Sequence, residues 1–111
     1  MEACVRAGIS IDRLILDPGI GFGKSLEHNL ALMANLDRLV ALGRPVLLGA
    51  SRKRFIGELT RAPKTKDRVP GSVAAALAGI AQGVHIVRVH DVAQTRQAIE
   101  VWQAIGAQAQ I

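Results

Sequence analysis

The chain has 111 residues, of which 50% are hydrophobic and 3% aromatic, and its 14 Lys and Arg residues outnumber its 9 Asp and Glu residues. This length allows one small domain and excludes a multi-domain enzyme, while the apolar fraction argues against disorder. The net charge of +5 favours an anionic ligand. Because aromatic side chains that could stack on bases are scarce, we expect no nucleic-acid partner.

The cellular environment is also indicated by the sequence. No uninterrupted apolar stretch approaches ~18 residues, so we expect no membrane span. The start, Met-Glu-Ala-Cys, lacks the apolar core of a signal peptide, which favours the cytoplasm. Cys4 is the single cysteine, and it fits a reducing compartment because it has no partner for an internal disulfide.

The first part of the chain predicts a strand between two helices. Residues 2–8 resemble the end of a helix, and the aliphatic run 14–16 predicts a buried strand because turn residues follow it. Apolar residues then recur at spacings of three and four between positions 30 and 40, which indicates a helix. Ser25 is its candidate N-cap and Gly43 its candidate C-cap.

The remainder repeats this order twice. The runs 46–48 and 86–89 predict two more buried strands. A helix is expected to start with Ser51, an Ala-rich helix follows Gly71-Ser72, and a last helix covers about 93–105. The Ala-rich helix is apolar nearly all round, so we expect it to be largely covered.

This order predicts the α/β class with parallel strands and right-handed crossovers. Three parallel strands form neither a closed barrel nor a comfortable open sheet, because two edges stay exposed. We therefore expect another part of the protein, or a second chain, to complete the fold. Polar residues follow each strand, at the end where parallel α/β folds bind ligands.

The first of these polar segments is the glycine-rich loop 17–24. Its glycine spacing does not match the dinucleotide fingerprint, and Pro18 stands where a phosphate loop needs glycine. An ordinary tight turn and a loop whose N–H groups approach a ligand both remain open. Asp17 either caps the turn or binds a pair of N–H groups on a heterocycle.

The second segment is Ser51-Arg52-Lys53-Arg54. Cations at a helix N-terminus oppose the helix dipole, which suggests a nearby anion or an acceptor-rich ligand. The alternative is that Arg52 and Arg54 are simply solvated. The basic run 61–68 is interpreted mainly as a solvated loop, and otherwise as a mobile loop near an anionic ligand.

The third segment is Arg88-Val89-His90, where the strand period of two places Arg88 and His90 on one side as a candidate phosphate site. A core histidine is the alternative. Asp91 is a candidate cap of the last helix, and we expect His28 and His85 to be structural or exposed. Nothing in the residue spacing supports a metal site, and we expect Cys4 to be inert.

Taken together, four segments closely resemble the dihydropteroate synthase family. They are Asp17–Lys24, Gly49–Lys53, Gly71–Ala75 and Arg88–Val92, and the resemblance extends over essentially the whole chain. It implies that residues 1–111 are the C-terminal part of a pterin-binding domain, namely the last three βα units of a (β/α)8 TIM barrel. The family condenses 6-hydroxymethyl-7,8-dihydropterin diphosphate with p-aminobenzoate, releases pyrophosphate and forms 7,8-dihydropteroate for folate biosynthesis. Sulfonamides mimic p-aminobenzoate.

The resemblance also implies roles for individual residues. Asp17 would bind the pterin ring, and Lys53 would contact the pterin and border the p-aminobenzoate site, which Gly21 and Phe22 would line. Arg88 and His90 would hold the diphosphate, with Mg²⁺ bound mainly through that diphosphate. The expected catalytic residues are therefore Lys53, Arg88 and His90.

Ser51 and Arg52 belong to the same Ser-Arg-Lys motif and are further candidates for binding substrate. Arg54 stands where many family members have the serine that meets the p-aminobenzoate carboxylate, a role that arginine can also take. Arg54 is therefore a candidate substrate-binding residue as well.

Two alternatives stay open beside this transferase. One is a catalytically silent module that binds a pterin or a phosphate, or that assembles with another barrel half. The other is an enzyme similar to methyltetrahydrofolate methyltransferases, although methyl transfer needs no diphosphate site. Besides the small-molecule substrates, we expect a homodimer or association with the missing barrel half, and an isolated chain that is incomplete as a catalyst.

Overall fold

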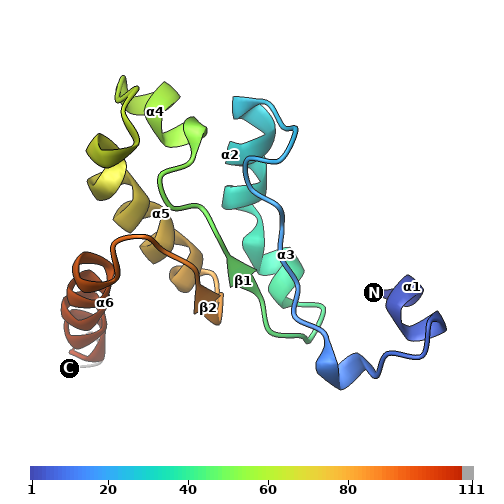
Figure 1. Cartoon of the computed structure of the whole chain (residues 1–111). Coiled ribbons are helices and arrows are strands. Elements are labelled where there is room, and N and C mark those ends of the chain that lie inside the picture. Colours follow the sequence, from blue (N-terminus) through green and yellow to red (C-terminus); the bar gives the residue numbers. More distant parts are fainter. Residues whose placement is uncertain (109–111) are drawn as a thin grey trace.

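A computed structural model describes residues 1–108, so the last three residues of the predicted 1–111 domain lie outside the described part. Figure 1 shows a small sheet with helices packed beside it, and α1 lying apart from the other helices. The elements are α1 (Glu2–Arg6), η1 (Ile11–Arg13), α2 (Leu26–Ala34), α3 (Leu36–Val40), β1 (Leu47–Leu48), α4 (Arg54–Thr60), η2 (Thr65–Arg68), α5 (Val69–Ala81), β2 (Ile86–Val87) and α6 (Val92–Ala107). Within the described residues, no helix combines the length and apolarity needed to cross a membrane.

The sheet is parallel, as predicted. In β1 and β2, Leu47 pairs with Ile86 and Leu48 pairs with Val87. The predicted first strand is reduced to one parallel bridge between Leu16 and Val46. It is held by hydrogen bonds from the Leu16 amide to Pro45 (2.9 Å) and from the Leu47 amide to Leu16 (2.8 Å). The α/β class is confirmed, with strands shorter than the apolar runs suggested.

The two faces of the sheet differ in burial. Val46 and Leu48 lie on the face that the helices cover, and both are fully buried. Ile15 and Ile86 lie on the opposite face and are 55% and 40% exposed. The prediction of strands buried on both faces is therefore wrong for this chain, because its helices pack against one side only. The core joins the covered face to Met33, Leu36, Phe55, Ile56 and Ala75 of these helices, and to Ile20 and Val84 of the adjoining loops.

The predicted helix between Ser25 and Gly43 is divided into α2 and α3. Ser25 caps α2 as expected, since its Oγ accepts the His28 N–H at 3.2 Å. The division falls at Asn35, and Gln82 at the end of α5 satisfies backbone groups on either side of it. Its amide nitrogen donates to the Met33 carbonyl and its amide oxygen accepts the Asp37 N–H. Gly43 follows α3 in the left-handed conformation (φ +85°).

The last three helices start at positions that differ from the predicted ones by up to a few residues. The helix predicted from Ser51 begins at Arg54, because Arg52 has a left-handed backbone (φ +56°) that a right-handed helix cannot include. α5 begins at Val69, with Pro70 in its first turn, where the missing N–H of proline is tolerated. One side of α5 is buried, whereas Ala74 is exposed, so this helix is covered less completely than predicted.

Candidate functional site

The three polar segments lie at one edge of the sheet. The loop 17–24 follows the Leu16 bridge, the turn 49–53 follows β1, and residues 88–90 follow β2. Because the three preceding segments run parallel, their carboxyl ends meet at the same edge. The turn 49–53 is central and contacts both neighbouring segments.

The loop 17–24 is held by its own side chains and by α2. Asp17 accepts the Gly19 N–H at 2.8 Å, so the turn-capping role expected for Asp17 is present. Lys24 Nζ donates to the carbonyls of Gly19 and Phe22 at 2.9 and 3.1 Å. The buried Asn29 accepts the Gly21 N–H at 2.9 Å through Oδ1. These bonds give the loop a defined shape.

Lys53 joins this loop to the turn after β1. Its Nζ lies 4.5 Å from the centroid of the Phe22 ring, a cation–π contact. Its aliphatic chain passes so close to Gly21 that a Cβ there would lie 3.1 Å from Lys53 Cδ. Gly21 also has a left-handed backbone (φ +86°), so glycine suits this position for two reasons. The structure thus brings Lys53, Gly21 and Phe22 together.

Arg88 and His90 contact the turn after β1 from the other side. The Arg88 guanidinium lies over Gly49, and a Cβ on Gly49 would collide with its Nη2. His90 Nδ1 lies 3.0 Å from the buried Ser51 Oγ, which also accepts the His90 backbone N–H at 3.2 Å. Arg88 thus contacts Gly49 and His90 contacts Ser51, so a spacing of two residues in one segment matches a spacing of two in the other. This spacing agrees with the expectation that both lie on one side of the segment.

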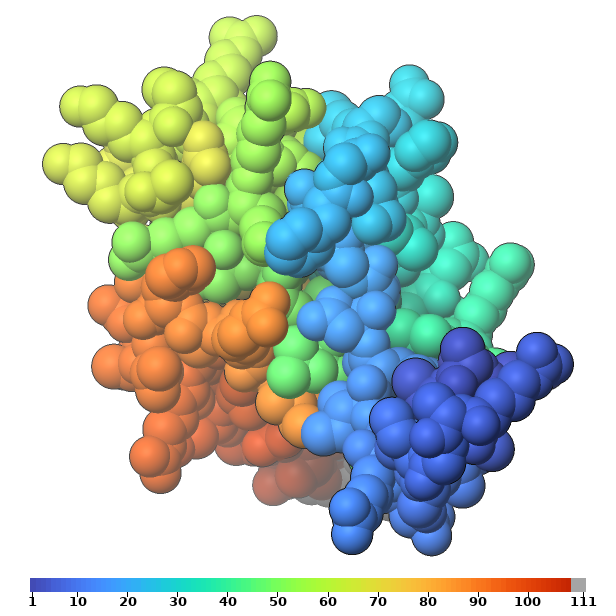
Figure 2. Space-filling model, turned by 45° about the vertical axis from the view of Figure 1, so that its right-hand side comes forward, coloured from blue at the N-terminus to red at the C-terminus, as the bar shows by residue number. Residues whose placement is uncertain are grey.

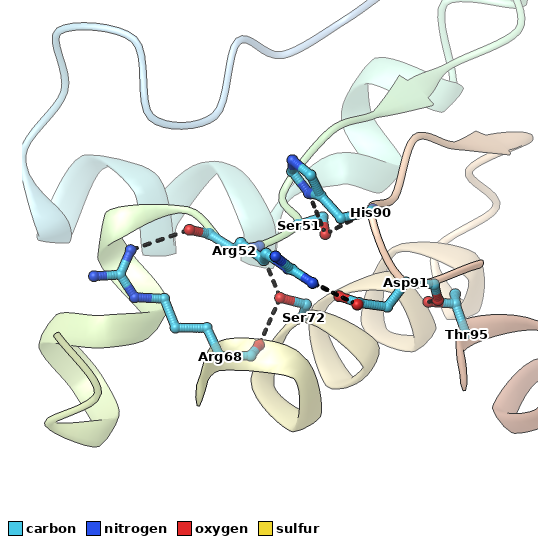
Figure 3. Close-up of polar contacts among 7 residues, drawn as sticks. All are labelled: Ser51, Arg52, Arg68, Ser72, His90, Asp91 and Thr95. Carbon is cyan, nitrogen blue, oxygen red and sulfur yellow. Dashed lines mark hydrogen bonds and ion pairs between the residues drawn. The ribbon is translucent and has the colours of Figure 1, made fainter. Parts of the chain in front are cut away.

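Arg52 forms a two-point ion pair with Asp91, shown in Figure 3. Its Nη2 lies 2.6 Å from Oδ1 and its Nε lies 3.1 Å from Oδ2. The Arg52 and Asp91 side chains are 28% and 12% exposed. The hydrogen bonds from Arg52 hold the pKa of the Asp91 carboxyl below its usual value, and those same bonds raise the pKa of Arg52. Asp91 stands at the N-cap position of α6, but its carboxylate binds Arg52 instead of capping the helix.

Arg54 behaves differently from Arg52. It is exposed at the start of α4, and its Nε lies 3.0 Å from Glu58 Oε1 one helical turn further on. The solvated interpretation therefore describes Arg54, whereas Arg52 is engaged with Asp91.

Three residues support the site without having been predicted. Asn29 is the first, and a helix-face analysis could have found it, since it shares a face with Met33. Ser72 is buried in α5, accepts the Arg52 N–H at 2.7 Å and donates to the Arg68 carbonyl at 2.6 Å. Arg68 donates to the carbonyls of Ala62, Pro63 and Arg52 at 2.8, 2.8 and 3.1 Å, so it is not solvated as expected for the run 61–68. No sequence pattern distinguishes Arg68 from its basic neighbours.

The other titratable candidates have structural or surface positions. His85 Nδ1 accepts the Val46 N–H at 3.1 Å, and His28 is exposed on α2. Throughout residues 1–108, no three His, Cys, Asp or Glu side chains gather where they could hold a metal ion.

The family model for pterin binding enzymes matches residues 1–90, so the chain belongs to the pterin-binding enzyme family. Its relatives include the dihydropteroate synthase of Neisseria meningitidis serogroup B (strain ATCC BAA-335 / MC58), which is 57% identical over 106 residues. That match covers 93% of this chain and 37% of the relative. The resemblance to dihydropteroate synthases that the motifs indicated is therefore confirmed.

Solved structures of dihydropteroate synthases are similar to this chain as well. The dihydropteroate synthase of Xanthomonas albilineans in complex with 7,8-dihydropteroate matches with a TM-score of 0.92 and 54% identity, over 96% of this chain and 40% of that one. The enzyme of Thermus thermophilus in complex with 6HMPPP matches with a TM-score of 0.86 and 53% identity, over 93% of this chain and 40% of that one. The chain thus spans about two fifths of these proteins.

Proposed function

We propose that the chain is the C-terminal part of a transferase of the dihydropteroate synthase type. The whole enzyme condenses 6-hydroxymethyl-7,8-dihydropterin diphosphate with p-aminobenzoate and releases pyrophosphate. One observation carries this proposal: Lys53, Arg88 and His90 come from two consecutive parallel units, and all three belong to or contact the turn 49–53. Cationic and imidazole donors at the carboxyl edge of a parallel sheet suit a phosphorylated substrate.

Arg88 and His90 form the diphosphate end of the site. As the C–O bond at the pterin methylene breaks, negative charge grows on the leaving pyrophosphate, and donors already in place stabilise that charge. The Ser51 contact occupies His90 Nδ1, so the His90 ring is oriented before any anion arrives. The aromatic amine of p-aminobenzoate then attacks the methylene carbon and loses one N–H proton to solvent or to the departing pyrophosphate, a step that needs no protein nucleophile.

Lys53 and the loop 17–24 form the organic end of the site. In this proposal Asp17 binds the pterin ring, Lys53 contacts the pterin, and Gly21 and Phe22 line the p-aminobenzoate side. The contact of Lys53 with the Phe22 ring supports the assignment, because it places the residue proposed for the pterin next to a residue proposed for p-aminobenzoate.

Three further candidates belong to the motif after β1. Arg54 is exposed, and its surface pair with Glu58 is of a kind that contributes little, so its guanidinium can exchange Glu58 for the p-aminobenzoate carboxylate. Ser51 and Arg52 remain predicted members of the substrate site, although their side chains contact His90 and Asp91.

In this proposal, Mg²⁺ is bound mainly through the diphosphate of the substrate. Mg²⁺ prefers oxygen ligands, but Asp91 is paired with Arg52, and Asp17 accepts a backbone N–H. The residues at this edge therefore fit a diphosphate that carries the ion and do not fit a direct protein site for it. Bound in that way, Mg²⁺ would neutralise part of the diphosphate charge that Arg88 and His90 also face.

We further infer that the three units are the last three of a (β/α)8 barrel, with residues 1–111 forming the C-terminal part of that domain. The uncovered sheet face at Ile15 and Ile86 and the 37% coverage of the Neisseria relative support this. The missing barrel half, or a second copy of the chain, would cover that face. The isolated chain is then an incomplete catalyst of a cytoplasmic enzyme.

A second candidate is a silent module that binds a pterin or a phosphate without turnover. A methyltransferase similar to those acting on methyltetrahydrofolate fits less well, because methyl transfer does not need a diphosphate site of the kind that Arg88 and His90 would form.

Calorimetric titration tests the diphosphate site. We expect 6-hydroxymethyl-7,8-dihydropterin diphosphate with Mg²⁺ to bind the chain, and Arg88→Ala to weaken binding roughly tenfold, as for a lost charge-assisted hydrogen bond. Arg96→Ala is the control, because Arg96 is exposed on α6 and pairs with Glu100. Equal binding by the wild type and Arg88→Ala would overturn the assignment of Arg88.

A further inference from the structure

Residue 52 is fixed by three different parts of the chain. Its N–H donates to Ser72 of α5 at 2.7 Å, and its carbonyl accepts from Arg68 of η2 at 3.1 Å. Its guanidinium binds both oxygens of Asp91 at the start of α6. These contacts hold a left-handed backbone (φ +56°) that a non-glycine residue seldom adopts unless its surroundings enforce it.

Two neighbouring contacts connect the turn after β1 with the segment after β2. Ser51 binds His90, and Arg52, the next residue, binds Asp91, the residue after His90 (Figure 3). On the other side of Arg52, Lys53 is the N-cap residue of α4, and its ammonium lies over the Phe22 ring. Arg52 therefore lies in the chain between Ser51 and Lys53, which both belong to the proposed site, while its own guanidinium binds Asp91.

We propose that Arg52 is a positioning residue, which holds Lys53 and His90 in place through its two-point contact with Asp91 and does not itself contact the substrate. This inference rests on the proposed function, because it concerns the same anion site, and it assigns Arg52 a different role from the substrate contact predicted from the motif. The forked guanidinium matches the carboxylate at two points, which a lysine ammonium cannot do.

The alternative is that Arg52 attracts the anion directly, and the two roles predict opposite results. Asp91→Asn removes a negative charge and releases the guanidinium, so a direct role predicts unchanged or tighter anion binding. A positioning role predicts weaker binding, because the contact that holds the turn is lost. Arg52→Lys separates the roles again, since it keeps the charge but loses the two-point geometry.

The experiment is a calorimetric titration of the full chain with inorganic pyrophosphate. We expect Asp91→Asn and Arg52→Lys each to weaken binding roughly tenfold, and the double variant to be about as weak as either single one, because both remove the same contact. Arg96→Gln removes an exposed arginine–carboxylate pair from α6 and should leave binding unchanged. Unchanged or tighter binding by Asp91→Asn would overturn the proposal, and so would wild-type binding by Arg52→Lys.

A second measurement needs no ligand and so separates this inference from the proposed function. The imidazole Cε1–H signal of His90 is followed by NMR in both variants, with His28 and His85 as internal references for the fold. We expect the His90 signal to shift and the two references to remain, and an unmoved His90 signal would refute the positioning role. If the wild type fails to bind pyrophosphate, the proposed anion site is wrong for this chain, while the NMR result still decides the role of Arg52.

Discussion

Single buried polar side chains determine the shape of the candidate site. Asn29, Ser51 and Ser72 are all buried, and each binds a backbone N–H of a neighbouring loop or turn. A buried polar group is stable only when its hydrogen bonds are made, so these residues favour one loop conformation over others. The shape of the site thus depends on Asn29 and Ser72, which lie outside the predicted set of substrate-binding residues, as well as on Ser51.

Asn29 offers a direct test of this dependence. We expect Asn29→Ala to lower the free energy of unfolding by about 1 kcal/mol, because the Gly21 N–H loses its partner. Urea-induced unfolding measures the change. Gln97→Ala, which removes an exposed amide from α6, is the control and should have little effect. Equal unfolding midpoints for the two variants would contradict the anchoring role of Asn29.

The Arg52–Asp91 pair predicts a pH dependence of stability. Because the folded-state pKa of Asp91 is lowered, its favourable contribution is present above the ordinary carboxyl value of about 4 and is lost as the pH falls through the lower folded-state pKa. Melting temperatures of the wild type and Asp91→Asn should therefore differ above about pH 4 and converge at lower pH.

Glu100→Gln is the matched control, because Glu100 belongs to the exposed pair with Arg96. Its melting curve should follow the wild type across the acid range. A constant difference between the wild type and Asp91→Asn from pH 7 to pH 2 would show that Asp91 acts through something other than its charge.

At the level of elements, the helices pack closely on the sheet where α5 carries Gly79. A Cβ there would lie 2.5 Å from Leu48 Cδ2 and 3.6 Å from Leu36 Cδ1, both core side chains. The approach of α5 to β1 therefore requires a residue without a side chain. β1 in turn carries the turn 49–53, so this contact sets where the site stands relative to α5.

Gly79→Ala should consequently destabilise the chain by roughly 1–2 kcal/mol, since overpacking of the core outweighs the gain in helix propensity. Gly106→Ala provides the comparison, because a Cβ at Gly106 in α6 would meet nothing within 4 Å. That variant should be neutral or gain at most about 1 kcal/mol. Thermal unfolding measures the stability of both variants, and a Gly79→Ala variant more stable than the wild type would refute the close packing.

Sequence patterns predicted the elements better than their ends. Short apolar runs separated by segments of helical spacing correctly predicted the order of the elements and the parallel sheet. The interruption at Asn35 was not predictable, because Gln82, far away in the sequence, satisfies the freed backbone groups. The Arg52 partner escaped prediction for the same reason, since Asp91 lies 39 residues away and looked like a helix cap.

The molecule as a whole is open. Its radius of gyration is 15.3 Å, against about 13 Å for a compact domain of similar length. Figure 2 shows the N-terminal residues, in dark blue, at one lower corner of the molecule. On α2 and α3, a groove of about 700 Å³ is lined mostly by apolar side chains, among them Leu32, Leu39 and Leu42. Such a surface favours association.

We therefore expect the purified chain to associate with a second copy at micromolar concentration, with light scattering as the measurement. Leu42→Glu places a charge in the groove and should shift the chain toward the monomer. Leu59→Glu is the control, since Leu42 and Leu59 are 54% and 53% exposed and Leu59 lies on α4 outside the groove. A monodisperse wild-type monomer would contradict the expectation.

The way the first sixteen residues join the rest has a consequence for amide hydrogen exchange. They are held by the two backbone hydrogen bonds at Leu16, by the packing of Leu16 against the core, and by Arg44. The Arg44 guanidinium donates to the carbonyls of Leu14 and Asp12 at 3.2 and 2.8 Å and lies 3.9 Å from the Asp12 carboxylate. A segment with so few attachments opens at a low free energy, independently of global unfolding. Its amides should exchange with deuterium well before those of Ile86 and Arg88, which bond to the central strand segment, and Arg44→Ala should widen that difference.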